Sequence, residues 1–393
     1  MRHQLAGLAL ALLLGTGCSS DNDGVSPPAG ATVTGVVREG GSNSPVAGAT
    51  VSLAGASTTS SASGQFQLQN VPTGVGRSLV VFAPGYATFS QSVEVKAGAN
   101  TLDVTLMHTG LYEAGNYLMY LPPQITTYRG VFVVMFGGTV DTRPLLRGDL
   151  NYYQPFPLSG DVVDYRQRMF DFARNNGFAV VAAAFGTQTR GTVAYANLMN
   201  AVNTVGNQSG HAELANAPFV LHGHSATACF AYEFAIAHPN RTIGFIAAKM
   251  SCNADPGAAV GVPGYFFFGE NDLTVPAHIA AQMRTLVEQN RARGALWAYA
   301  VEPGAGHAQV ANQELLFDWV AAAVALRLPA TGSVLQPISE AAGWLGDHAT
   351  FAVGSHPCFS SNKATASWLP SAQTARDWQT LVSRGSITTT LTC

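Results

Sequence analysis

The sequence has little charge of either sign. Only 11% of its 393 residues are Asp, Glu, Lys or Arg, against about 25% in an average soluble domain. The 20 basic and 23 acidic residues give a formal net charge of −3. The chain therefore lacks both the basic surface of a nucleic-acid-binding protein and an acidic disordered tail, and we expect no nucleic-acid partner.

Long apolar runs are absent as well. The run from Leu5 to Leu14 follows Arg2 and His3 and is far shorter than the roughly 20 residues that span a bilayer, but it suits a secretion signal. The predicted signal covers residues 1–17. It ends before Cys18 in a way that resembles a bacterial lipoprotein signal, whose cysteine receives a lipid and becomes the new N-terminus. An ordinary signal with a leftover cysteine is the alternative.

The lipoprotein resemblance implies an exported protein of the bacterial periplasm or cell surface, held at the membrane only through a lipid on Cys18. Residues 18–30 are polar and contain proline, as expected of a tether between an anchor and a folded domain. The apolar stretch 320–326 is no second anchor, because Arg327 and Pro329 interrupt it.

Metal-binding patterns are missing too. The sequence has no CxxC motif and no His/Cys cluster, so we expect no zinc and no cofactor. Besides Cys18 there are four cysteines, an even number in a compartment where disulfides persist. Three pairings are open to them. We expect Cys229 with Cys252 and Cys358 with Cys393, since the members of each pair lie in the same region of the chain.

Short strand-like runs separated by Gly, Pro, Ser and Asn fill residues 31–108, which predicts a small antiparallel all-β sandwich. The predicted strands are 32–37, 50–53, 65–68, 79–82, 91–95 and 102–106. Pieces such as Pro45-Val46-Ala47-Gly48-Ala49-Thr50-Val51 and Ala83-Pro84-Gly85-Tyr86 resemble the carboxypeptidase regulatory-like module of secreted bacterial proteins. The resemblance implies a spacer or an accessory binding module without chemistry of its own.

Residues 111–330 follow a different pattern, in which strand-like runs alternate with amphipathic stretches of helix length. This alternation predicts an α/β domain whose mostly parallel sheet is covered on both faces. The predicted strands are 117–120, 131–136, 179–184, 219–222, 243–248, 264–268 and 297–301, and the predicted helices are 163–175, 193–205, 226–237, 277–293 and 309–326. Such sheets bind ligands at the carboxyl ends of their strands, so we expect the site there.

A Gly-x-Ser-x-small motif gives the strongest chemical signal. Gly223-His224-Ser225-Ala226-Thr227 leads from a predicted strand into a predicted helix. A serine on such a sharp turn is exposed, and small residues two places before and after it prevent a collision of strand and helix. The last position is usually Gly, so Thr227 is a departure. A serine that only caps the helix is the alternative.

Two further motifs follow the serine. Asp272 lies in the loop after the strand 264–268, and His307 ends the glycine-rich loop Pro303-Gly304-Ala305-Gly306-His307 after the next strand. The order Ser, acid, His, each at the carboxyl end of a strand, resembles the α/β-hydrolase fold. Residues 111 to about 328 are similar to secreted esterases of the dienelactone hydrolase, feruloyl esterase and polyhydroxyalkanoate depolymerase type.

The chemistry of these three residue types assigns their roles. A serine hydroxyl is a weak nucleophile, so His307 would take its proton while Asp272 holds the imidazole in the right tautomer. Glu270 and Asp255 compete for the role of the acid. His222, His224 and His238 do not lie in a loop that follows a later strand, so we interpret them as local packing or polar residues.

The anionic intermediate needs two backbone donors. We expect the first to be the N–H of Ala226, directly after the nucleophile, and the second to come from the loop after an earlier strand. The loop Met135-Phe136-Gly137-Gly138-Thr139 resembles the His-Gly-Gly loop of many esterases, with Phe in place of His. Gly138 is the expected donor. Gly137, Thr139 and a simple tight turn are the alternatives.

These features predict a monomeric serine hydrolase that cleaves small-molecule or polymeric carboxylic esters through an acyl-enzyme. A catalytically idle, hydrolase-like protein used for binding or adhesion is one alternative, and a peptidase or amidase with the same triad is another. Low charge gives little electrostatic steering, so we expect a neutral or apolar ester. Tyr152, Tyr153, Phe156 and Phe170 are candidates for the pocket lining, although core packing suits Phe170 equally well.

Residues 331–393 follow the predicted hydrolase. They contain three tryptophans, Trp344, Trp368 and Trp378. We expect a C-terminal extension that packs on the hydrolase through these side chains.

Overall fold

The computed structural model describes residues 30–40, 43–137, 140–149, 159–184, 191–308 and 312–387, without the side chains of 159–163. The chain divides into two compact units: the first contains the chain up to Arg38, Ser44–Val81 and Phe89–Thr105, and the second contains Glu39–Asn43, Phe82–Thr88 and the chain from Leu106 onward. None of the described helices is long and apolar enough to cross a membrane.

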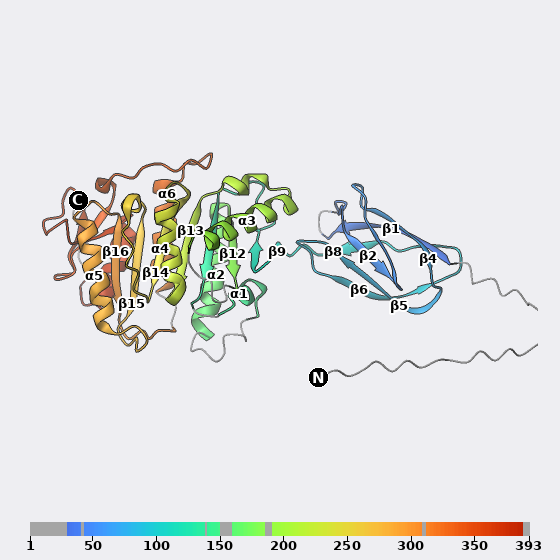
Figure 1. Ribbon diagram of the computed structural model, residues 1–393, viewed down its shortest axis with the longest axis horizontal. Helices are drawn as coiled ribbons and strands as arrows, with labels where there is room; N and C mark the ends of the chain where they lie inside the picture. Colours follow the sequence, from blue (N-terminus) through green and yellow to red (C-terminus); the bar gives the residue numbers. More distant parts are fainter. Residues whose placement is uncertain are drawn as a thin grey trace, which may run out of the picture. The chain divides into compact units, whose positions relative to one another are not determined.

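The first unit consists of short strands in two sheets (Figure 1). One sheet has the order β4 (Gln65–Val71), β1 (Ala31–Glu39), β7 (Ala99–Thr101), with β8 (Val104–Leu106) also paired to β1. The other has the order β3 (Ala56–Thr59), β2 (Thr50–Leu53), β5 (Gly74–Phe82), β6 (Phe89–Val95). Alternate residues such as Val51, Leu53, Phe66 and Leu68 are buried, the pattern of sheets with one face on a core.

The predicted all-β character of this unit is confirmed, with one difference in pairing. β1 and β7 run parallel, whereas the sequence pattern predicts antiparallel strands throughout. The two strands lie far apart in the chain, and that separation supplies the long connection that parallel neighbours need. β3 is absent from the prediction because its sequence, Ala-Ser-Thr-Thr, lacks bulky apolar residues.

An eight-stranded sheet forms the centre of the second unit, in the order β16-β15-β14-β13-β11-β12-β10-β9. Its strands are β9 (Leu111–Ala114), β10 (Tyr117–Tyr120), β11 (Gly130–Met135), β12 (Phe178–Ala183), β13 (Phe219–His224), β14 (Thr242–Ala248), β15 (Gly264–Gly269) and β16 (Trp297–Glu302). β10 pairs antiparallel with both β9 and β12, and the neighbouring pairs from β12 to β16 in the sheet order are parallel. The predicted α/β-hydrolase fold is therefore present.

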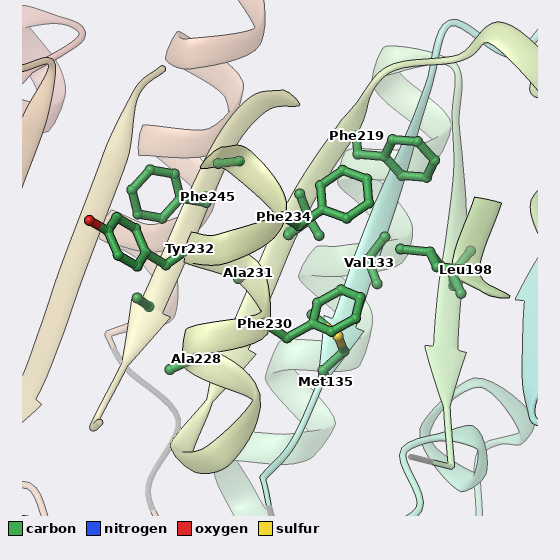
Figure 2. Packing of buried hydrophobic residues seen from close by; sticks show 14 of the residues in the cluster. Val133, Met135, Leu198, Phe219, Ala228, Phe230, Ala231, Tyr232, Phe234 and Phe245 are labelled. Atoms are coloured by element: carbon green, nitrogen blue, oxygen red, sulfur yellow. The ribbon is translucent and has the colours of Figure 1, made fainter. Parts of the chain in front are cut away.

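Helices cover both faces of this sheet (Figure 1). α3 (Thr192–Ser209), α4 (Ala228–Ala237) and α5 (Ala277–Arg291) pack on one face, and α1 (Arg143–Arg147), α2 (Ser159–Asn176) and α6 (Gln313–Arg327) pack on the other. Figure 2 shows the first face, where Phe230 of α4 lies close to Met135 and Leu198 of α3 lies beside Val133, both of β11. These contacts fix α4, the helix that follows Ser225, against the strands that carry the site.

The last segment covers the edge of the large sheet. β17 (Trp344–Gly346), β18 (Val353–Ser355) and β19 (Ser367–Leu369) form an antiparallel sheet that precedes α7 (Ala372–Val382). On the edge strand β16, the Tyr299 N–H donates to Ser367 Oγ and the Tyr299 carbonyl accepts from Trp378 Nε1, both at 2.9 Å. The extension thus satisfies backbone groups that an edge strand would otherwise expose.

Most predicted elements of the second unit occur with shifted ends. The predicted helix from 309 begins instead at Gln313, because the Asn312 side chain accepts from the Leu315 N–H at 3.0 Å and so caps the helix there. β9 and the strands of the extension are missing from the prediction, since three or four residues are too few to show a period.

Candidate active site

Ser225 lies in the turn between β13 and α4. Its φ is +56°, in the left-handed region that non-glycine residues rarely adopt. A Cβ on Gly223 would lie 2.1 Å from the Thr227 carbonyl oxygen, so only glycine fits two places before the serine. Ser225–Thr227 forms a short 3-10 turn that leads into α4. The strained turn of the sequence motif is therefore present.

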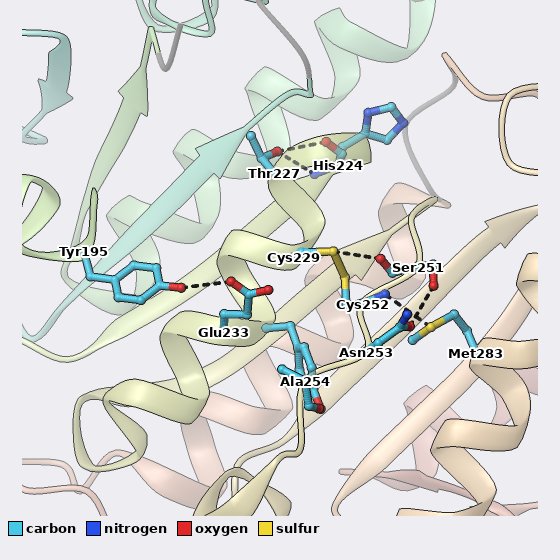
Figure 3. The surroundings of a disulfide bond; sticks show 11 residues. Tyr195, His224, Thr227, Cys229, Glu233, Ser251, Cys252, Asn253, Ala254 and Met283 are labelled. Carbon is cyan, nitrogen blue, oxygen red and sulfur yellow. Dashed lines mark hydrogen bonds between the residues drawn. A yellow bond between two sulfur atoms is a disulfide. The ribbon is translucent and has the colours of Figure 1, made fainter. Parts of the chain in front are cut away.

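Thr227 fits the place where the motif usually has glycine. Its side chain is buried, and Oγ1 accepts from the His224 N–H at 3.1 Å. The hydroxyl donates toward the carbonyl oxygens of Met135 and His224, each 2.8 Å away; Figure 3 shows its bonds to His224. Met135 is the last residue of β11, so Thr227 joins the serine turn to the strand that precedes the glycine loop.

Ser225, His307 and Asp272 form one hydrogen-bonded chain. His307 Nε2 is 2.9 Å from Ser225 Oγ, and His307 Nδ1 is 2.8 Å from Asp272 Oδ2. Asp272 Oδ1 accepts from the N–H groups of Thr274 and Val275 at 2.9 and 2.8 Å. The Asp272 side chain is 1% exposed and that of His307 is 21% exposed. The carboxylate is therefore fixed by the protein, while the imidazole is partly exposed to solvent.

The two competing acids lie elsewhere. Glu270 accepts from the Gly304 N–H at 2.8 Å and pairs with Arg384 through its other oxygen. The Gly304 hydrogen bond, with the Arg384 charge beside it, holds the pKa of Glu270 below its usual value. The Asp255 side chain is 81% exposed. Among the contacts of the described residues, the carboxylate that meets His307 is that of Asp272.

The backbone beside Ser225 offers a donor for an anion. Ala226 is in the first turn of the helix, where N–H groups have no helical acceptor. Gly137 packs closely here, since a Cβ on it would lie 2.9 Å from Ala226 N and 2.3 Å from Ser225 Cβ. Gly138 and Thr139 lie outside the described residues. The structure thus brings the glycine loop to the serine, and Gly138 as second donor stays a prediction.

The other histidines of the prediction have neighbours of their own. His222 Nδ1 is 2.6 Å from the Tyr165 hydroxyl, and burial lowers the pKa of His222 to about 3. The His238 ring packs 4.9 Å from that of Phe234. In the part of the chain that the structure describes, no group of three or more His, Cys, Asp or Glu side chains could hold a metal ion.

Of the four aromatic candidates for a pocket lining, the structure describes Phe170. Phe170 stacks on Tyr120 with ring centroids 4.2 Å apart and belongs to the core. Tyr152, Tyr153 and Phe156 lie outside the described residues.

A disulfide joins α4 to the loop after β14 (Figure 3). It links Cys229 and Cys252, whose Cα atoms are 5.2 Å apart, and confirms the first predicted pair. The second predicted pair includes Cys393, which lies outside the described residues, as does the predicted lipidation site Cys18.

The sequence analysis predicts no role in the site for two side chains that lie beside the triad. Lys249 Nζ donates to the Gly306 carbonyl at 2.6 Å, and His224 Nε2 lies 2.7 Å from the His307 carbonyl oxygen. Lys249 belongs to no motif. The one signal in the sequence is that a lysine directly follows the buried apolar strand Thr242–Ala248.

The first unit matches a known family model. Residues 32–107 match the carboxypeptidase regulatory-like domain, as the sequence resemblance predicts. A chain of a type II cohesin–X-dockerin complex from Acetivibrio cellulolyticus is 22% identical, with a TM-score of 0.18 over 20% of this chain and 58% of that chain. No curated protein matches the sequence.

Solved esterase structures also resemble the chain. Esterase PE8 is 16% identical, with a TM-score of 0.36 over 52% of this chain and 96% of that one. Est1E from Butyrivibrio proteoclasticus is 9% identical, with a TM-score of 0.36 over 55% and 98% of the two chains. S-formylglutathione hydrolase from Staphylococcus aureus is 9% identical, with a TM-score of 0.36 over 55% and 95%. Residues 32–107 belong to the carboxypeptidase regulatory-like domain family.

Proposed function

We propose that the second unit is a serine hydrolase that cleaves carboxylic esters through an acyl-enzyme. Ser225 is the proposed nucleophile, His307 the general base and Asp272 the acid that orients it. One observation carries the proposal: Ser225 Oγ, the His307 imidazole and the Asp272 carboxylate are joined by hydrogen bonds of 2.9 and 2.8 Å. A nucleophile, a base and an orienting group in mutual reach are what acyl transfer requires.

In the proposed reaction, Ser225 Oγ bonds to the ester carbonyl carbon while its proton passes to His307 Nε2. The carbonyl oxygen becomes an anion, which the N–H of Ala226 and a second N–H, predicted to be that of Gly138, stabilise. The imidazolium, stabilised by Asp272, gives its proton to the leaving alkoxide as the carbon–oxygen bond breaks. Water then repeats both steps and releases the carboxylic acid and free Ser225.

The alternative functions have less support. Thr227 is the one sequence feature that favours an idle, hydrolase-like binding protein, and its side chain fits the turn with hydrogen bonds of its own. A peptidase or amidase differs only in the bond that the same triad cleaves. None of the contacts among described residues favours an amide substrate, so amide turnover is an outcome of the test below.

Export, a lipid anchor on Cys18 and a neutral or apolar ester substrate are further parts of the proposal. The Cys229–Cys252 disulfide supports a compartment outside the reducing cytosol, and the small net charge supports a neutral substrate. In Cys18→Ser, we expect the protein to leave the membrane fraction of expressing bacteria. A membrane fraction like that of the parent would contradict the lipid anchor.

The direct test compares the parent with Ser225→Ala on a short-chain nitrophenyl ester. We expect kcat to fall about 10⁶-fold, and a fluorophosphonate probe to label only the parent. Ser251→Ala is the matched control, because this nearby serine bonds to Asn253 and belongs to no part of the triad. Equal hydrolysis by Ser225→Ala would contradict the proposal. Turnover of amides but not esters would assign the triad to an amidase.

A further inference from the structure

The loop Gly304–His307, here called the His307 loop, has a donor at each of its four carbonyl groups. The bonds are Asn271 Nδ2 to Gly304 O at 3.3 Å, Asn271 N to Ala305 O at 2.9 Å, Lys249 Nζ to Gly306 O at 2.6 Å and His224 Nε2 to His307 O at 2.7 Å. Two of the four loop residues are glycine, whose backbone is intrinsically permissive. The shape of the loop therefore depends on these donors.

Lys249 and His224 approach the loop from neighbouring strands. His224 ends β13 and is in register with Ala248, the last residue of β14. The next residues on the two strands, Ser225 and Lys249, both have positive φ, +56° and +58°. Two adjacent strands thus end in the same left-handed conformation, one with the serine and the other with an ammonium group. Such strain in non-glycine residues concentrates at functional sites.

Lys249 is a costly choice of donor. The chain has only three lysines, and Lys249 is fully buried, with 0% of its surface exposed. A buried charge carries a large desolvation penalty, which a neutral donor to the same carbonyl would avoid. Desolvation of the His224 ring, reinforced by the Lys249 charge, lowers the pKa of His224 to about 3. His224 is therefore neutral near pH 7, with its one ring proton on Nε2 facing the His307 carbonyl.

We infer that Lys249 and His224 are positioning residues that hold the imidazole of His307 in line with Ser225 Oγ. The inference rests on the proposed function, because alignment matters only if His307 takes the serine proton. Lys249 acts through the Gly306 carbonyl of the His307 loop, and His224 acts through the His307 carbonyl and through its ring, whose centroid is 5.2 Å from that of the His307 imidazole. Displacement of a catalytic group by about 1 Å costs about 100-fold in rate, so a loosened loop is expected to slow the chemical step.

Lys249→Met tests the stronger of the two bonds. Methionine keeps much of the apolar stem and removes the donor. We expect kcat for the nitrophenyl ester to fall about 50-fold while KM changes less than about threefold, because the base is misplaced and the binding surface is kept. Arg327→Met is the matched control, since Arg327 is another buried cation that donates to backbone carbonyls, at the amino end of β14. Its kcat per folded molecule is expected to stay within about twofold of the parent value.

His224 supplies a second pair of variants. Gln in place of His224 retains an N–H donor, whereas Met of similar size has none. We expect His224→Gln to keep most of the parental kcat and His224→Met to lose about 10-fold. The far-downfield proton NMR signal of His307 Nδ1–H is an independent readout. We expect this signal to broaden in Lys249→Met and His224→Met and to stay sharp in Arg327→Met and His224→Gln, although the loss of the neighbouring His224 ring shifts its position in both His224 variants.

A folded Lys249→Met protein with the parental kcat and an unchanged His307 signal would overturn the inference. An equal loss of kcat in Arg327→Met would overturn it too, because the loss would then follow from general destabilisation. Failure of the proposed function gives a different result, namely full activity in Ser225→Ala. Should Lys249→Met not fold, equal kcat in His224→Gln and His224→Met would be the overturning result.

Discussion

The two ends of β14 are held by the same kind of contact. At the carboxyl end, the ammonium group of Lys249 donates to the Gly306 carbonyl of the His307 loop. At the amino end, the buried guanidinium of Arg327 donates to the carbonyls of Thr242, Gly261 and Pro239 at 3.0, 2.8 and 2.8 Å. Burial lowers the pKa of Arg327 to about 10, so it stays charged at neutral pH.

The backbone around the two cations differs. At the carboxyl end, Ser225 and Lys249 are left-handed, and the bound carbonyl belongs to the loop of His307. At the amino end, Thr242 is extended, with φ −111°. The carbonyl groups bound there belong to segments that carry none of the proposed catalytic residues. Unstrained backbone held by a cation contributes stability, whereas strained backbone persists only where its surroundings enforce it. We conclude that the contact at the amino end serves the fold and that at the carboxyl end serves alignment.

The largest expected effect is at the carboxyl end. Asp272→Asn is expected to lower kcat about 10³- to 10⁴-fold, because an amide cannot hold the required tautomer of His307 or stabilise the imidazolium. The free energy of unfolding is expected to change by about 1 kcal/mol, because the Asn Oδ1 can still accept from the N–H groups of Thr274 and Val275 while the bond to His307 is lost. Ester kinetics and urea unfolding measure the two quantities. Asp255→Asn, which changes an exposed carboxylate, is the control. A similar loss in both variants would contradict the assignment of Asp272.

The next largest effect concerns the amino end. Arg327→Met is expected to lower the free energy of unfolding by about 4 kcal/mol, since three carbonyl oxygens lose a charged donor. A cavity of about 790 Å³ beside Arg327 lets water reach these oxygens and limits the loss. Urea denaturation measures it. A loss below about 1 kcal/mol would remove the contrast between the two ends.

The disulfide at the carboxyl end is expected to contribute somewhat less. Replacing Cys229 and Cys252 together by Ala removes the link between α4 and the loop after β14. We expect a loss of about 3 kcal/mol in unfolding free energy, because the unfolded chain gains freedom, with kcat kept in the folded protein. Unfolding without reductant measures the change. An unchanged urea midpoint would show that packing alone holds the two segments together.

The smallest effect is a pH dependence beneath the site. Burial lowers the pKa of His222 to about 3. Between about pH 6.5 and pH 3, His222 is therefore protonated in the unfolded chain and neutral in the native protein. The contribution of neutral His222 to stability is therefore fully present above pH 6.5, and at one pH unit below that value it has fallen by about 1.4 kcal/mol. His222→Asn removes this contribution, and its unfolding free energy is expected to fall less steeply with acid than that of the parent. Parallel pH profiles of the two proteins would contradict this.

Local pattern predicts most of the long, regular elements of the α/β domain, whereas the 11-residue helix α7 of the extension is missing from the prediction. Largely apolar strands such as Phe178–Ala183 and Thr242–Ala248 are evident from sequence because both of their faces are buried. The serine turn is predictable because Gly223 has a steric reason that depends only on its neighbours in the chain. β9 and the small sheet of the extension are too short to give such a signal.

Contacts between distant segments escape such reasoning. From sequence alone, Thr227 is a departure from the Gly-x-Ser-x-Gly motif. Only the position of Met135 on the neighbouring strand shows that the Thr227 hydroxyl joins the serine turn to β11. The choice of Asp272 over Glu270 depends on which carboxylate of one loop faces His307. Both outcomes follow from strand order and register.

The sequence by itself determined a sandwich followed by an α/β domain, and it determined which residue types could perform acyl transfer, because these follow from periodicity and from short motifs. Only the tertiary structure decided which acid meets His307 and that Lys249 and His224 hold its loop. Hydrogen bonds between residues as far apart as Lys249 and Gly306 depend on how the strands are ordered in the sheet, and no local pattern contains that order.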